Sequence, residues 1–136
     1  MTLPDKDKVA PTILVVEDDV LIRMPIAAYL RECGYKVIEA ASGEEARLVL
    51  QQKDLHIDVM LADTRTSSTE QSFGLVQWAR KTLPDLKLLL AATPKRAVAV
   101  AGQLCEEGPM LAKPYDPQIV EQHIRRLLAA RARRRG

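Results

Sequence analysis

The chain has 136 residues, of which 47% are hydrophobic and 28% charged, as in an ordinary globular domain. Only 4% are aromatic, which argues against a surface that stacks nucleic-acid bases. No apolar stretch approaches the roughly 18 residues of a transmembrane helix, and residues 1–11 lack the apolar core of a secretory signal. The distant Cys33 and Cys105 match no metal pattern. We therefore expect a cytoplasmic protein without a membrane partner.

The net charge of +2 hides an asymmetry between the body of the chain and its end. The last twelve residues contain no acid and six arginines, namely Arg125, Arg126, Arg131, Arg133, Arg134 and Arg135. Up to Ile124, 14 basic residues face 18 acidic ones, which leaves a charge of −4. The sequence thus predicts a mildly acidic domain with a basic tail, which we interpret as a solvated helix end and not as a nucleic-acid-binding segment.

Short apolar runs alternate with segments of helical spacing along the chain. Ser42 and Glu45 have the spacing of a capping box, and Asp116 followed by Pro117 is a strong helix start. The expected strands are residues 12–16, 35–39, 57–62, 86–91 and 109–112. The expected helices are residues 20–33, 42–53, 73–83, 95–107 and a last one from about 116 into the arginines.

Strand followed by helix, five times over, predicts a doubly wound, five-stranded parallel sheet of the α/β class, (βα)5, with helices on both faces. We expect a flexible lead-in over residues 1–10, one domain over residues 11–130 and the basic tail over residues 131–136. The polar residues 64–72 are expected to form a loop.

Charged residues follow three of the five expected strands. Glu17, Asp18 and Asp19 follow the first strand, Asp63 follows the third and Lys113 follows the fifth. In open α/β sheets ligands bind beyond the carboxyl ends of the strands. Clustered carboxylates repel one another unless a cation neutralises them, and oxygen ligands suit Mg²⁺. A lysine beside them suits a phosphoryl oxygen.

These motifs resemble the receiver domain of two-component response regulators, the family of the bacterial chemotaxis receiver. The resemblance covers residues 11–128 and rests on ILVVEDD at residues 13–19, DVMLAD at 58–63 and KPY at 113–115. The separations, 45 residues from Asp18 to Asp63 and 50 from Asp63 to Lys113, are close to those of the family. The resemblance implies a flavodoxin-like fold with strand order 2-1-3-4-5.

The resemblance also implies a role for each matching residue. Asp63 accepts a phosphoryl group, Asp18 and Asp19 hold Mg²⁺ with Asp63 and the backbone carbonyl of Arg65, and Lys113 contacts the phosphoryl group. The implied protein is a stand-alone phosphoprotein of two-component signal transduction. A sensor histidine kinase or a histidine phosphotransfer protein is its donor, and a downstream protein its target. It is not an enzyme beyond self-catalysed phosphotransfer and autodephosphorylation, and homodimer formation is left open.

Three departures from the family pattern concern the switch. Ala91 stands where the family usually has Ser or Thr, Met110 where it often has Tyr or Phe, and residues 66–72 lack the usual proline and glycines. One alternative is therefore a degenerate receiver that acts as a phosphorylation-independent interaction module. A small Mg²⁺-dependent phosphatase of the haloacid-dehalogenase type is less favoured, because Arg65 stands where that family has its second aspartate.

Overall fold

Parallel strands form one sheet in the computed structural model of the chain, which describes residues 10–63, 69–92, 110–112 and 115–135. Its order is β2-β1-β3-β4-β5, and every neighbouring pair is parallel. The strands are β1 (Thr12–Val16), β2 (Lys36–Ala40), β3 (Val59–Asp63), β4 (Lys87–Ala92) and β5 (Met110–Ala112). The doubly wound parallel arrangement is confirmed, and β5 joins its edge through only three residues.

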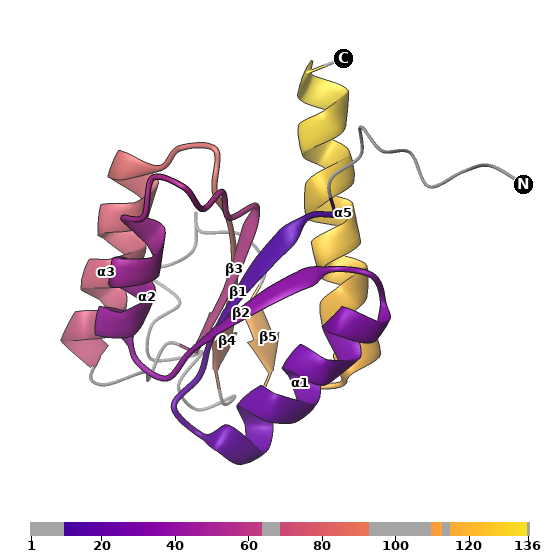
Figure 1. Ribbon diagram of the computed structural model, residues 1–136, viewed down its shortest axis with the longest axis horizontal. Helices are drawn as coiled ribbons and strands as arrows, with labels where there is room; N and C mark the ends of the chain where they lie inside the picture. The colour runs from indigo at the N-terminus through magenta and orange to yellow at the C-terminus, as the bar shows by residue number, and fades with distance from the viewer. Residues whose placement is uncertain (1–9, 64–68, 93–109, 113–114, 136) are drawn as a thin grey trace, which may run out of the picture.

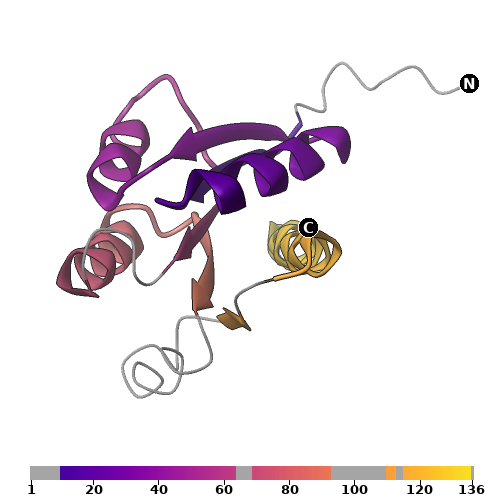
Figure 2. The ribbon, with the colours of Figure 1, turned by 90° about the horizontal axis from the view of Figure 1, so that it is seen from below.

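Helices cover both faces of this sheet, as Figures 1 and 2 show. The described helices are α1 (Val20–Glu32), α2 (Gly43–Leu50), α3 (Thr69–Thr82) and α5 (Pro117–Arg135). Helices α2 and α3 lie on one face, and α1 and α5 lie on the other. The helix expected at residues 95–107 lies outside the described residues.

The buried strand residues alternate between two hydrophobic cores, because successive side chains of a strand point to opposite faces. In β1, Leu14 and Val16 are buried beneath α2 and α3, whereas Ile13 and Val15 are buried beneath α1 and α5. Because helices cover both faces of the sheet, both sets of strand side chains are buried, and the strands are continuous apolar runs in the sequence.

Local sequence signals mark the start of α2 and the end of α1. The Ser42 hydroxyl accepts a hydrogen bond from the Glu45 amide at 3.1 Å, and the Glu45 carboxylate accepts one from the Ala41 amide at 2.6 Å. The predicted capping box is therefore formed at α2. Beyond α1, Gly34 has a φ of 103°, a left-handed conformation that glycine adopts without strain.

Three elements, α2, α3 and β3, have an end that differs from the sequence-based expectation by two residues or more, and the other described ends agree within one residue. Helix α3 begins at Thr69, inside the stretch expected to be a loop, because Glu and Gln are good helix formers and no glycine or proline interrupts that stretch. Helix α2 ends at Leu50, earlier than expected, and β3 is shifted to include Asp63. No helix in the described part of the chain combines the length and apolar character needed to cross a bilayer.

Candidate functional site

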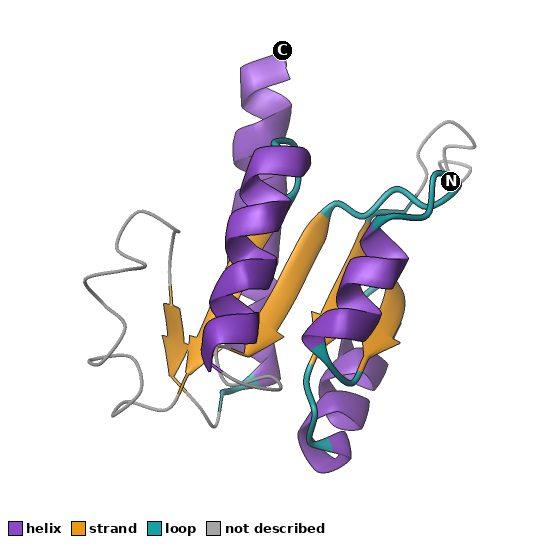
Figure 3. Cartoon of the chain, turned by 90° about the vertical axis from the view of Figure 1, so that its left-hand side faces the viewer, coloured by secondary structure: helices purple, strands orange, loops and turns teal. Residues whose placement is uncertain are grey.

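The carboxyl ends of the strands meet at one edge of the sheet, toward which all arrowheads point in Figure 3. At this edge Val16 is the register partner of Ala62, so the residues that follow β1 lie beside Asp63 at the end of β3. The main chain of Asp63 is in turn paired with Ala91 of β4, and Ala92 with Ala112 of β5. The backbone therefore brings the ends of β1 and β3 together as the sequence predicts. Arg65 and Lys113 lie outside the described residues.

Glu17 is the buried carboxylate of this edge. It is only 2% exposed, and its amide donates to the carbonyl of Ala40 at 3.0 Å, which ties it to β2. Its Oε2 accepts a hydrogen bond from the amide of Asp19 at 3.1 Å. A buried carboxylate is stable only where charges or donors compensate it, and the Asp19 amide is one such donor to Glu17.

Asp18 and Asp19 are both exposed, but their surroundings differ. Asp19 is the N-cap of α1, and its Oδ1 accepts a hydrogen bond from the amide of Leu21 at 2.9 Å. A side-chain oxygen that caps a helix satisfies one of the free amides of the first turn. The structure thus gives Asp19 a helix-capping role, and its predicted role as a magnesium ligand stays a prediction.

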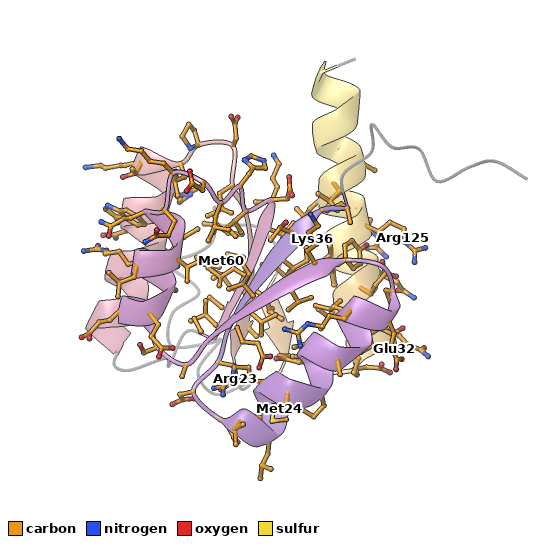
Figure 4. All side chains as sticks on the ribbon, in the orientation of Figure 1. Arg23, Met24, Glu32, Lys36, Met60 and Arg125 are labelled. Carbon is orange, nitrogen blue, oxygen red and sulfur yellow. The ribbon has the colours of Figure 1, made fainter. Side chains whose placement is uncertain are left out.

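Arg23 fixes the backbone that carries these acids. Its guanidinium donates to the carbonyl of Glu17 at 2.9 Å and to the Glu39 carboxylate at 3.2 Å. Arg23 thereby joins α1 to the ends of β1 and β2, and Figure 4 shows it beneath the strands at the start of α1. Neither Arg23 nor Glu39 is among the residues predicted from the sequence to belong to the site. The one sequence signal for the contact of Arg23 with Glu17 is that Arg23 lies about one helical turn after the acidic residues 17–19.

Ala91 occupies the strand position opposite the phosphoacceptor candidate. It is 1% exposed and packs in the core beneath α1 and α5. Its pairing with Asp63 places a methyl group where the family usually has a hydroxyl. Met110 begins β5 as the register partner of Leu90, and Thr93 lies outside the described residues.

The donor set at this edge fits a hard divalent cation. Glu17 and Asp18 carry carboxylates, the ligand type that Mg²⁺ prefers, and the backbone pairing of β1 with β3 sets Asp63 next to them in the fold. Among the side chains that the structure describes, no three acidic, histidine or cysteine groups form a metal cluster. The side chain of Asp63 is not among them.

A second polar cluster lies away from this edge, between β2 and α5. The Tyr35 hydroxyl donates to Glu121 Oε2 at 2.7 Å, and Arg125 donates to the same carboxylate. Burial and the bond to Glu121 raise the pKa of Tyr35 to about 12. Burial acts to raise the pKa of Glu121, but the bonds from Tyr35 and Arg125 outweigh it and lower that pKa.

No family model matches the chain, but known proteins resemble it in sequence and in structure. A probable transcriptional regulator, ycf27 of Cyanophora paradoxa, is 31% identical over 116 residues, which are 85% of this chain and 47% of that protein. The chain therefore spans about half the length of this relative.

Solved receiver domains share the fold over most of their length. The receiver domain of the hybrid histidine kinase CckA is 26% identical with a TM-score of 0.68, and the match covers 86% of this chain and 98% of that one. The response regulator TrrA of Thermotoga maritima, solved in complex with Mg²⁺ and BeF, is 21% identical with a TM-score of 0.73, over 86% and 98% of the two chains. The resemblance noted from the motifs is thus confirmed.

Proposed function

We propose that this chain, a response regulator receiver domain by sequence and fold, accepts a phosphoryl group on Asp63. The observation that carries the proposal is the backbone pairing that sets Asp63 beside the acidic residues after β1. An oxygen of the Asp63 carboxylate attacks the phosphorus of a phosphohistidine. The new P–O bond replaces the P–N bond, whose electron pair stays on the imidazole nitrogen.

We assign the metal-holding role to Glu17, Asp18 and Asp63, together with the backbone carbonyl of Arg65. This set differs from the one predicted from the sequence, because Glu17 takes the place of Asp19, whose carboxylate caps α1. Bound Mg²⁺ supplies positive charge that neutralises the phosphoryl oxygens. The Glu17 amide donates a hydrogen bond to the carbonyl of Ala40, and Arg23 donates one to the carbonyl of Glu17. Because these contacts hold the backbone that follows β1, the acids need little reorganisation to accept a cation. Lys113, which follows β5, is expected to pair with the phosphoryl group. The Mg²⁺ in the TrrA structure supports this assignment by analogy.

The phosphoryl donor is a histidine kinase or a histidine phosphotransfer protein in this proposal. Apolar side chains of α1 beside the acidic edge support it, since Leu21 is 81% exposed and Met24 58% exposed. An exposed apolar group next to a reacting carboxylate is suited to bind a donor protein. The output is contact with a downstream protein in the cytoplasm, and the chain acts on no other substrate.

Phosphorylation can be tested with a small-molecule donor. The chain is incubated with acetyl phosphate and Mg²⁺, and its intact mass is measured. We expect a gain of one phosphoryl group that is released by base or hydroxylamine, as for a mixed anhydride. Asp63→Asn abolishes the gain, whereas the exposed control Asp54→Asn keeps it.

A phosphoryl group that persists in Asp63→Asn contradicts the assignment of the acceptor. If the folded wild-type chain gains no mass with acetyl phosphate or with phosphorylated histidine kinase, the degenerate receiver is favoured. Ala91 is the observation that supports this second candidate, because a phosphoryl oxygen loses the hydrogen bond of the usual hydroxyl there.

A further inference from the structure

Helix α5 continues beyond the sheet that it covers. It spans Pro117–Arg135, about 28 Å at the rise of an α-helix. Among the α5 residues whose side chains the structure describes, Leu127 and Leu128 are the last that pack against the core beneath α1 and α5. The seven residues from Ala129 to Arg135 add about 10 Å, and Figures 1 and 3 show this end standing clear of the strands.

The projecting end concentrates the positive charge of the molecule. Four of the six arginines in the last twelve residues lie in this end, which has no acid, whereas Arg125 and Arg126 precede it and Arg125 pairs with Glu121 within α5. By helical spacing, positions 131, 134 and 135 fall on one side of the axis, and positions 126 and 133 fall on the other. Basic positions thus surround the helix, with alanines between them.

This end lies far from the acidic edge of the molecule. Helix α5 begins near the carboxyl ends of the strands and runs back against them, so its C-terminus leaves at the opposite edge of the sheet. The acidic residues after β1 and Asp63 at the end of β3 are therefore remote from the end of α5. A polyanion bound at the end of α5 would therefore not be repelled by the carboxylates at the carboxyl ends of the strands.

We propose that the projecting end of α5 binds duplex DNA through its phosphates, independently of base sequence. Arginine is suited to phosphate because its planar guanidinium donates two parallel hydrogen bonds. The major groove of B-DNA, about 12 Å wide, admits an α-helix, whereas that of A-form RNA is too narrow.

The composition of α5 disfavours the other polyanions. The helix contains no Trp, Tyr or Phe on which single-stranded bases could stack. After Leu128 it has no large apolar residue that could enter a membrane beside the arginines. Duplex DNA is therefore the partner that the charge and shape of this end fit best.

Fluorescence anisotropy of the full chain with a labelled duplex of arbitrary sequence tests this proposal. About four arginine–phosphate contacts predict a slope near −3.6 for log K against log salt, so binding weakens on the order of 100-fold from roughly 50 to 200 mM salt. Arg134→Gln with Arg135→Gln lowers affinity at least about tenfold and flattens the slope by about 2. Glutamine keeps the helix propensity.

The matched control removes the same charge elsewhere. Lys53→Gln with Lys81→Gln alters two exposed lysines on the α2 and α3 side, and we expect affinity within about threefold of wild type. Equal losses in both double variants, or no binding at up to about 100 µM protein, overturn the proposal. Tighter binding to single-stranded DNA, duplex RNA or anionic vesicles also overturns it.

Discussion

At the scale of single residues, three consecutive acids after β1 have three different environments. Glu17 is buried and accepts the Asp19 amide, Asp18 is exposed, and Asp19 caps α1. Their order in the sequence reveals none of this. Whether a carboxylate after a strand caps the next helix or turns inward depends on the backbone path, which the ties to Ala40 and Arg23 determine.

This difference predicts which acid governs the response to magnesium. Asn is as good an N-cap as Asp, so Asp19→Asn keeps α1 intact and removes only the charge. We expect Mg²⁺ to stabilise wild type and Asp19→Asn alike, by about 2.7 kcal/mol at one hundred times Kd. Asp18→Asn loses that stabilisation. Thermal melting with and without Mg²⁺ measures this stabilisation. If Asp19→Asn loses it and Asp18→Asn keeps it, Asp19 and not Asp18 is the magnesium ligand.

At the scale of elements, the cluster of Tyr35, Glu121 and Arg125 joins the start of β2 to α5. The carboxylate of Glu121 is 5% exposed and receives hydrogen bonds from both partners. Removing one donor from a buried carboxylate destabilises a fold more than the bond itself suggests. The cluster therefore helps to hold α5 against the sheet.

Alkaline unfolding tests the Tyr35 contact. Its folded pKa of about 12 exceeds the pKa of a tyrosine in the unfolded chain, about 10. The stabilisation is thus complete below pH 10 and is lost as pH rises toward 12. Tyr35→Phe lowers the free energy of unfolding by about 1.5 kcal/mol at neutral pH and flattens the loss above pH 10. An unchanged alkaline profile in Tyr35→Phe contradicts the role of this contact.

At the scale of the whole molecule, the sequence predicts the arrangement better than the boundaries. Apolar runs and caps such as Ser42 lead to the parallel sheet because burial on both faces leaves a continuous pattern. The early start of α3 at Thr69 escapes prediction, since its first turn lacks apolar periodicity. The burial of Glu17 escapes it too, because the compensating contacts come from residues distant in the chain.

The largest-scale consequence concerns how far a phosphoryl group on Asp63 changes the distant surface. Ala91 is opposite Asp63 and is packed in the core beneath α1 and α5. Because its side chain is only a methyl group, it donates no hydrogen bond to a phosphoryl oxygen. A hydrogen bond to a charged acceptor contributes roughly 1.5–3 kcal/mol, and without it the populations of two surface states shift less. The methionine at position 110 has a flexible side chain, so it does not switch between two fixed rotamers as an aromatic ring at this position would.

We therefore expect small chemical-shift changes on β5 and α5 when beryllofluoride and Mg²⁺ are added to the wild type. Ala91→Thr with Met110→Tyr enlarges them, because a hydroxyl then bonds the mimic and an aromatic ring takes up the vacated space. Ala91→Val with Met110→Leu is the control, since it adds bulk to position 91 without a hydroxyl. Large two-state shifts in the wild type contradict this expectation. They would require a relay through other residues, and Thr93 is the first to replace, by Val, because it lies two residues beyond Ala91.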